Sequence, residues 1–258
     1  MQKESYKIAI TLFFVLTAVI IYLTVGLESN NNYEIITLEI EGNKHLSQNS
    51  YLHYAGLDEQ ENYKYLTIGL IRDRIQKHPY VLTAMVSVDG NGKVKIELVE
   101  KVFKAQVLNG KGKYLLTNNV EILPLLENTQ NVNYPVIRLN GETEVLSPLT
   151  FPKTNPYLAD SYKILSAARL LNPSLYNNLS EIDFRNGKNA VLYFSSVDYP
   201  VILGEKNQIK KMVVFEKLWE SLSTVQASEL LDYVDLRFNN KVYLGLAGEH
   251  LQAEETQS

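Results

Sequence analysis

The sequence offers few side chains whose type and spacing suit catalysis. Its four histidines are scattered, and none belongs to the H-E-x-x-H pattern in which two histidines on one helix face bind zinc. The serine-nucleophile patterns G-x-S-x-G and S-x-x-K do not occur. The absence of cysteine excludes disulfides, thiolate nucleophiles and cysteine-ligated metals. These observations predict a protein without a catalytic centre, a metal or another cofactor.

Two groups of carboxylates lie close enough in sequence to be considered as acid–base pairs. They are Asp232 with Asp235, and Asp58 with Glu59 and Glu61. Neither group is accompanied by a nucleophile or a metal-ligand pattern, so we interpret both as solvated surface or turn residues. The net charge is −4 and no run of five or more lysines and arginines occurs, which argues against nucleic acid as a partner.

The most informative polar and aromatic residues lie in a predicted β-hairpin, YVDLRFNNKVYLGL, at residues 233–246. A three-residue loop at 239–241 would gather the apolar side chains on one face, and a slip of one residue would mix the two faces. The expected core-facing pairs are Phe238 with Val242, Leu236 with Leu244, and Val234 with Leu246. The expected outward-facing residues are Tyr233, Asp235, Arg237 and Tyr243.

The outer edge of the last strand in this hairpin has two possible uses. The polar and acidic residues 247–258 are poor material for a further strand, and an uncovered edge promotes aggregation. The edge could pair with an earlier strand of the same domain, or be blunted by Lys241 and the tail. Alternatively, a partner protein could add its own strand, with backbone hydrogen bonds giving affinity and side chains such as Tyr243 giving specificity.

The elements that must position this hairpin begin with a predicted membrane anchor. Residues 8–27 carry no charge, and as a helix they would span about 30 Å, the thickness of a bilayer core. The stretch is longer than the apolar part of a signal peptide, and no small-residue cleavage site follows it. Lys3 and Lys7 precede it, so the positive-inside rule leaves residues 1–7 as a cytoplasmic stub. Residues 28–32 would link the anchor to extracytoplasmic domains.

Residues 33–102 predict a small domain with the order strand, helix, helix, strand, strand. The expected strands are 34–41, 80–89 and 93–100, and the expected helices run from Ser47 to about Tyr54 and from Thr67 to His78. Arg72, Arg74 and Lys77 give the second helix a positive face. This face is a second possible contact surface, for an acidic partner or lipid headgroups, although a solvated helix face is the simpler explanation.

Residues 103–247 predict a β-rich domain with two helical insertions, and residues 248–258 a flexible tail. The helices are expected at 155–171, where Pro156 occupies the first helical position, and at 207–222. A hairpin at 181–194 contains the turn pair Asn186-Gly187. Its I-D-F-R sequence echoes the V-D-L-R of the last hairpin, which suggests two similarly built hairpins in one sheet.

The order of these elements resembles a known family. The strand, IEGNKHLS, the two helices, HPYVLTAMVSVD and KVKIELVEK resemble the POTRA domain that follows the anchor in FtsQ/DivIB-type cell-division proteins. VILGEKNQIKKMVVFEKLW followed by YVDLRFNNKVYL resembles the C-terminal part of their β domain. One departure is that Val102-Phe103, rather than a proline, follows Glu100-Lys101. The resemblance covers most of residues 8–247.

The resemblance implies an α+β fold: a single N-terminal transmembrane helix, a POTRA-like βααββ domain, and a mixed β-sheet domain. It implies a non-enzymatic scaffold of the divisome in the cytoplasmic membrane that binds FtsB/FtsL-like proteins and recruits septal peptidoglycan synthases. The implied partner-binding residues are Tyr233, Asp235, Arg237, Phe238, Asn239, Asn240, Lys241, Val242, Tyr243 and Gly245. The exported domains would be periplasmic where an outer membrane exists. The alternative is a generic membrane-anchored POTRA-type partner-binding protein in export or envelope assembly.

Overall fold

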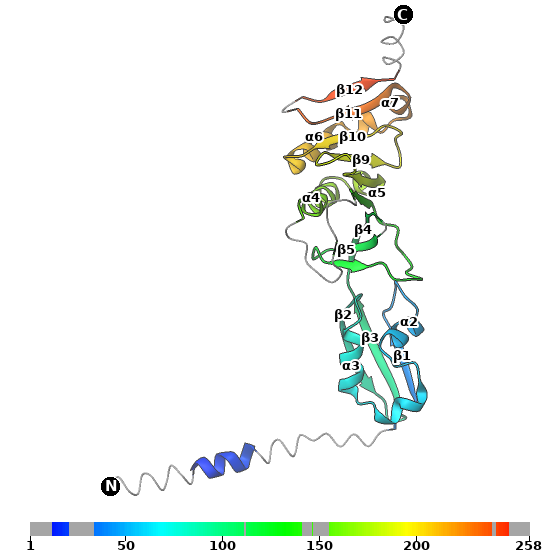
Figure 1. Ribbon diagram of the computed structural model, residues 1–258, viewed down its shortest axis with the longest axis vertical. Helices are drawn as coiled ribbons and strands as arrows, with labels where there is room; N and C mark the ends of the chain where they lie inside the picture. Colours follow the sequence, from blue (N-terminus) through cyan, green and yellow to red (C-terminus); the bar gives the residue numbers. More distant parts are fainter. Residues whose placement is uncertain are drawn as a thin grey trace, which may run out of the picture.

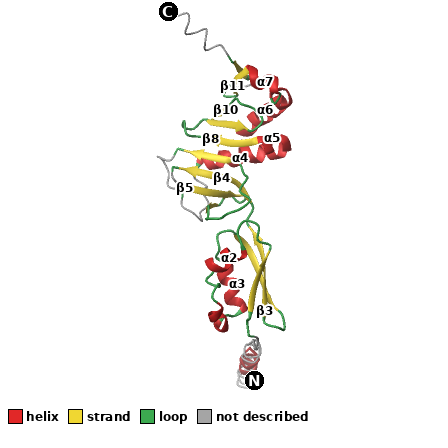
Figure 2. Ribbon diagram, turned by 90° about the vertical axis from the view of Figure 1, so that its right-hand side faces the viewer, coloured by secondary structure: helices red, strands yellow, loops and turns green. Residues whose placement is uncertain are grey.

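The computed structural model describes residues 12–20, 34–110, 112–140, 146, 155–238 and 241–247. Two domains follow one another along the long axis of the molecule (Figure 1). Each domain consists of a sheet with helices packed on one face (Figure 2). This layout confirms the predicted α+β class.

The predicted membrane anchor lies largely outside these residues. Residues 12–20 are helical, and the predicted span 8–27 extends beyond them on both sides. Within the described ranges, no helix combines the length and the hydropathy that a membrane crossing requires. The predicted stub 1–7, the linker 28–32 and the tail 248–258 also lie outside the described residues.

The first domain has the predicted βααββ order with one additional short helix. Its elements are β1 (Thr37–Glu41), α2 (Gln48–Tyr54), the 3₁₀ helix η1 (Gln60–Tyr65), α3 (Ile68–Gln76), β2 (Val81–Val88) and β3 (Lys93–Glu100). The sheet order is β1-β3-β2, with β1 parallel and β2 antiparallel to β3. Ser47 and Thr67 cap α2 and α3 as predicted, since each hydroxyl oxygen accepts a hydrogen bond from the backbone N–H three residues later.

The second domain is built on one nine-stranded mixed sheet of order β12-β11-β10-β9-β8-β7-β4-β5-β6. The strands are β4 (Phe103–Asn109), β5 (Gly112–Thr117), β6 (Ile122–Pro124), β7 (Val136–Leu139), β8 (Leu179–Asp183), β9 (Ala190–Phe194), β10 (Val201–Gly204), β11 (Leu231–Asp235) and β12 (Tyr243–Leu246). The helices are α4 (Pro156–Leu171), α5 (Pro173–Asn178), α6 (Gln208–Leu222) and α7 (Val225–Leu230). The four helices all lie on the same side of the sheet (Figure 2).

The prediction of one helix in each insertion was incomplete. Both α4 and α6 are followed by a second helix of six residues, α5 and α7, which leads directly into a strand. Asn172 and Thr224 cap these short helices through their side-chain oxygens. Six residues span fewer than two helical turns, too short for a periodic apolar pattern to reveal them in the sequence.

The two domains share buried apolar packing where they meet. Phe103, Leu115 and Leu123 of the second domain belong to the same buried cluster as Ile71 and Ile96 of the first. At the junction predicted to be unusual, residues 100–103, Phe103 is thus buried in the shared core, whereas Val102 is 52% exposed. The second domain therefore cannot rotate freely against the first without exposing apolar surface.

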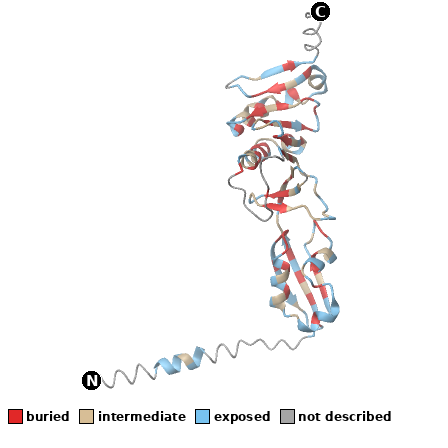
Figure 3. Ribbon diagram, in the orientation of Figure 1, coloured by how far each residue is buried: buried red, intermediate tan, exposed pale blue. Residues whose placement is uncertain are grey.

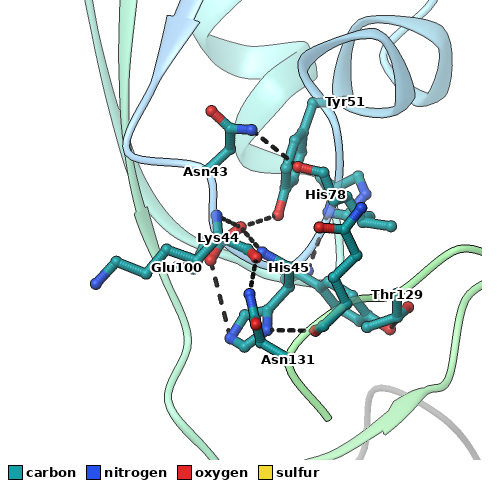
Figure 4. A network of polar contacts seen from close by, with 11 residues as sticks. Asn43, Lys44, His45, Tyr51, His78, Glu100, Thr129 and Asn131 are labelled. Carbon is teal, nitrogen blue, oxygen red and sulfur yellow. Dashed lines mark hydrogen bonds and ion pairs between the residues drawn. The ribbon is translucent and has the colours of Figure 1, made fainter.

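Polar contacts centred on Glu100 reinforce this junction (Figure 4). Its Oε1 atom accepts hydrogen bonds from the backbone N–H groups of Lys44 (3.0 Å) and His45 (3.2 Å), and from the Tyr51 hydroxyl. The Gln130 N–H donates to the His45 carbonyl at 2.7 Å, and Asn131 Nδ2 donates to the Lys44 carbonyl at 2.7 Å. The turn after β1 is thereby bonded both to its own domain and to the second.

Candidate functional site

Strand β12 forms one end of the nine-stranded sheet, at the end of the molecule remote from the first domain (Figure 1). It pairs antiparallel with β11, and no other strand in the described parts of the chain pairs with it. The predicted alternative, in which its outer edge pairs with an earlier strand, does not occur among these residues.

The predicted register of the hairpin was wrong by two residues. The observed pairs include Val234 with Leu244 and Asp235 with Tyr243, so the connection runs from 236 to 242. Asn239 and Asn240 of the predicted three-residue loop lie outside the described residues. The physical reason is that the Arg237 backbone N–H, the next amide on the β12 side after Asp235, donates to the Asp235 carboxylate at 2.9 Å, so the ladder with β12 ends at Asp235.

The predicted core face was correct for Val234 and Leu236, correct in part for Val242, which is half-buried against the core, and wrong for Phe238, Leu244 and Leu246. Val234 and Leu236 are 0% and 2% exposed, whereas Phe238, Leu244 and Leu246 are 52%, 48% and 49% exposed. Figure 3 shows this change from buried β11 to largely exposed β12. The helices α6 and α7 bury β11 but leave Leu244 and Leu246 of β12 about half exposed. The apolar alternation of β12 therefore does not mark a fully buried face.

Asp235 and Arg237 were predicted to face outward, but the Asp235 side chain is buried. Its carboxylate accepts hydrogen bonds from the Arg237 backbone N–H (2.9 Å), Nε (2.9 Å) and NH2 (2.6 Å). Burial alone would raise the pKa of this carboxyl, but the bonds and charge of Arg237 outweigh it and hold the pKa below its usual value. The pair fixes the end of β11, and its first role is structural.

The aromatic residues of the hairpin contact its backbone and each other. Gly245 lies beneath the Tyr233 ring, so closely that an added Cβ would come 2.3 Å from the ring. The rings of Phe238 and Tyr243 meet edge to face at 4.8 Å. Beside Phe238, a small cleft is lined by Lys241 together with residues of α6 and neighbouring turns: Asn207, Lys210, Lys211, Val214 and Leu236. The predicted site residues within the described ranges thus come together at one end of the molecule.

The backbone of β12 carries a feature that sequence reasoning missed. The Ala247 N–H points inward, donating to the Leu230 carbonyl at 3.0 Å. The direction of the backbone N–H alternates along a strand. The N–H groups of Tyr243 and Gly245 therefore also point toward β11, whereas those of Leu244 and Leu246 point toward the open edge. Only the register could have revealed this, because the side-chain pattern does not show which way each amide points.

In the second predicted contact surface, Arg72, Arg74 and Lys77, two of the three side chains bond to groups of their own domain. Arg74 NH1 donates to the Gly56 carbonyl at 3.0 Å, and Lys77 Nζ pairs with Asp73 at 2.7 Å. Arg72 is exposed. Two of the three predicted cations therefore support α3 and its neighbours.

The carboxylates and histidines of the described ranges form no catalytic arrangement there. His53 pairs with Asp58 at 2.7 Å on an exposed surface, and His45 lies 3.9 Å from Glu100 at the domain junction. No group of three metal-ligating side chains occurs in the part of the chain that the structure describes. His250 lies outside it.

Comparison with known proteins places these domains in a family. Residues 101–237 match the family described as cell division protein FtsQ/DivIB, C-terminal, and residues 34–101 match the POTRA domain, FtsQ-type. The cell division protein DivIB of Clostridium acetobutylicum is 23% identical over 219 residues, covering 82% of this chain and 82% of that protein. The cell division protein FtsQ of Syntrophotalea carbinolica is 21% identical over 229 residues, covering 86% of this chain and 77% of that protein.

A solved structure of the major extracytoplasmic domain of DivIB from Geobacillus stearothermophilus is 14% identical and covers 48% of this chain and 95% of that one. Its TM-score is 0.30, and we base no argument on so low a score. The first family match alone, over residues 101–237, spans more than half of the chain. The predicted resemblance is thereby confirmed, and the chain belongs to the cell division protein FtsQ/DivIB family.

Proposed function

We propose that this protein is a membrane-anchored, non-enzymatic scaffold of the bacterial division machinery that receives a partner's strand on the outer edge of β12. The observation that carries the proposal is this edge: β12 pairs with β11 alone among the described strands, and its geometry directs the amides of Leu244 and Leu246 outward. Backbone groups so displayed are a template for an added strand.

Side chains around the edge would supply specificity. Tyr243, Phe238 and Leu246 are all about half exposed, and Lys241 adds a positive charge beside them. Aromatic and apolar side chains that are exposed together mark protein contact surfaces more often than isolated ones do. The partner class is FtsB/FtsL-like single-span division proteins, and septal peptidoglycan synthases would be recruited through the same assembly.

The rest of the molecule would set the position of this edge. An anchor at residues 8–27 confines the domains to the membrane surface and raises their effective concentration near other membrane proteins of the septum. The shared core at the domain junction holds the two domains together. The POTRA-like domain, with Arg72 on its exposed helix face, would offer a second contact. The protein then orders its partners without chemistry of its own.

The test is amide hydrogen exchange on the full-length chain in lipid nanodiscs, alone and with an FtsB-like extracytoplasmic segment. New protection at Leu244 and Leu246, with little change at already paired β11, is the expected result. Leu244→Pro removes one outward N–H, whereas Leu244→Ala shortens the side chain and keeps that N–H. We expect the proline variant to bind at least about tenfold more weakly than the alanine variant, as for the loss of one or more hydrogen bonds.

Two outcomes would contradict the proposal. One is partner binding that protects other parts of the chain and leaves 243–246 unchanged. The other is equal partner affinity of the proline and alanine variants, provided that exchange in β11 shows the domain still folded.

A further inference from the structure

A groove lies where the turn after β1 meets the segment that joins the two domains. Its volume is about 880 Å³. It is lined by residues 42–45 of the turn, by residues 98–103 from the end of β3 to the start of β4, and by Asn131 and Tyr134 of the second domain. This is the region where the domains meet, away from β12 (Figure 1). An occupant of the groove would therefore contact both domains.

One carboxylate oxygen in the lining of this groove lacks a hydrogen-bond donor. The Glu100 side chain is only 5% exposed. Its Oε1 atom accepts three hydrogen bonds, whereas its Oε2 atom is buried and accepts none from the residues that the structure describes. A buried carboxylate oxygen without a donor is unfavourable, so a donor brought by a ligand would be bound favourably there.

A second acceptor lies near this oxygen. His45 Nε2 is 3.9 Å from Glu100 Oε2, too far for a hydrogen bond between them (Figure 4). The other ring nitrogen, Nδ1, is 3.1 Å from the Gln130 carbonyl oxygen. A carbonyl can only accept, so Nδ1 carries the hydrogen, and Nε2 of the neutral ring is an acceptor. The two atoms together suit a ligand that donates to both.

The surroundings favour an organic cation over a metal ion. Within the described ranges, no third histidine, aspartate or glutamate joins His45 and Glu100 in a metal-binding group, so a metal ion would have only two protein ligands. The groove instead offers apolar and aromatic contacts. Val99 and Val102 are 47% and 52% exposed, and Tyr134 is half-buried. The methylene groups of an arginine side chain pack on such apolar surface, and its guanidinium is attracted to aromatic rings.

We propose that this groove receives an arginine side chain of a partner protein, whose guanidinium donates to Glu100 Oε2 and His45 Nε2. Charge complementarity selects this occupant, because a guanidinium is always charged and carries five donors in one plane. Of the two lysines in the lining, Lys101 is paired with Glu121 at 2.9 Å, and Lys44 is exposed. The contact is separate from the strand proposed on β12 and does not depend on it.

The first test is a titration of the full-length chain in lipid nanodiscs, with carbon-13 at the ε1 position of its four histidines. Ethylguanidinium is the probe, since it has the chemistry of the end of an arginine side chain. We expect a saturable shift of the His45 signal and smaller changes at the other three histidines. Ethylammonium and zinc chloride, used as comparison ligands, should bind more weakly.

A matched set of variants separates the groove from general electrostatics. Glu100→Gln keeps an acceptor for the three donors at Oε1 but loses the charge, and should weaken ethylguanidinium binding at least about tenfold, as for a lost charge-assisted hydrogen bond. Glu97→Gln is the control: Glu97 is exposed on the same strand and does not line the groove, so affinity should stay unchanged. Lys44→Gln should strengthen binding, because it removes a like charge.

The second test shows whether a protein supplies the cation. In growing cells, p-benzoylphenylalanine replaces Val102 of the full-length chain, and crosslinked peptides are identified by mass spectrometry. We expect crosslinks to one partner segment, close to an arginine, that disappear when Glu100→Gln is added or when that arginine is replaced by glutamine. Leu170 is the control position, since it is 86% exposed on α4 and does not line the groove.

Several results would overturn the inference. An unshifted His45 signal, or an equal response of Glu100→Gln and the native chain, would exclude a cation at these two acceptors. Tighter binding of ethylammonium or zinc would replace arginine by another cation. A Val102 crosslink that survives Glu100→Gln, or no Val102 crosslink to a partner, would exclude a partner arginine in the groove. None of these measurements involves β12, so failure here is distinguishable from failure of the proposed function.

Discussion

At the scale of single residues, the Asp235–Arg237 pair ends β11. The Arg237 backbone N–H and guanidinium donate to the Asp235 carboxylate, and we call this arrangement a clasp. Asp183 and Arg185 do the same at the end of β8, with nearly identical distances. A nearly buried carboxylate with such partners leaves an uncompensated charge when the arginine is removed. Because the two clasps are alike but only one adjoins β12, comparing them separates an effect on domain stability from an effect on partner binding.

We predict that Arg237→Ala and Arg185→Ala destabilise the domain by similar amounts, because each leaves a largely buried carboxylate with unmet hydrogen bonds. Only Arg237→Ala should also weaken partner binding, since only its clasp adjoins β12. Urea unfolding and partner titration of both variants provide the measurements. A binding defect of equal size in Arg185→Ala would show that the clasps act through stability alone.

His78 makes stability depend on pH. It is 2% exposed, and burial, aided by the charge of Lys101, lowers its pKa from 6.5 to about 4. Its Nδ1 accepts the Tyr80 N–H at 3.1 Å, so protonation there would break that bond and bury a charge. Because the folded-state pKa lies below the unfolded one, the unfolded chain binds more protons between these values. Stability is full above pH 6.5 and falls by up to about 1.4 kcal/mol per pH unit toward pH 4.

Urea midpoints measured from pH 7 to pH 4 should show this slope in the native chain. The His78→Asn variant keeps an acceptor near the position of Nδ1 but has no proton to bind in this range. Its stability should change less over the same interval. Identical pH profiles for the two chains would assign the acid sensitivity to other groups.

At the scale of elements, the β11–β12 pair depends on Gly245, because the Tyr233 ring occupies the space of a Cβ there. We predict that Gly245→Ala displaces the ring and reduces hydrogen-exchange protection of β12 by about 1 kcal/mol, a modest overpacking effect. Exchange in β10 and β9 should not change. The double variant Tyr233→Ala, Gly245→Ala should restore protection, and its failure to do so would mean that the ring is not the cause.

Local signals predicted local structure well. Ser47, Thr67 and Asn155 were identified as helix starts because a cap is a contact between residues three positions apart. The register of β12 was missed because the Asp235 carboxylate takes the Arg237 backbone N–H and ends the ladder early, and the alternation of apolar residues carries no sign of that side-chain bond. The two similarly built hairpins, predicted from I-D-F-R and V-D-L-R, are confirmed by the matching ladders of β8 with β9 and of β11 with β12. The helices that precede the two hairpins share too little sequence to show that the likeness extends to them.

The candidate site, too, could be predicted in part from local sequence signals. Its location in the last hairpin could be predicted, since apolar alternation and an unused edge are visible in the sequence. Which side chains it exposes could not, because Leu244 and Val234 are both apolar strand residues. In the folded domain the helices cover Val234 of β11 but leave Leu244 of β12 half exposed.

At the scale of the whole molecule, the proposed scaffold role raises the question of whether the first domain and β12, at the remote end, keep a fixed relation. Tyr80, just before β2, contributes directly to it. Its hydroxyl contacts the Pro124 carbonyl (3.1 Å), Thr129 Oγ1 (2.9 Å) and the Leu126 N–H (2.9 Å), all in the second domain. The ring also packs against Phe103 at 5.0 Å. One side chain thus joins the apolar and polar parts of the junction.

We predict that Tyr80→Phe keeps both domains folded but loosens their connection, because the ring packing remains while the Leu126 N–H loses its acceptor. The loss should amount to about 1 to 3 kcal/mol, the usual penalty of an unmet buried hydrogen bond. Spin labels at exposed Leu82 and Val225, one in each domain, should report a broader distance distribution in the variant. Binding of a partner segment to β12 in solution should be unchanged, whereas recruitment at the septum should fall if a fixed geometry matters. A broadened distance distribution with normal recruitment would show that the anchor and the edge suffice, and that rigidity between the domains is not needed.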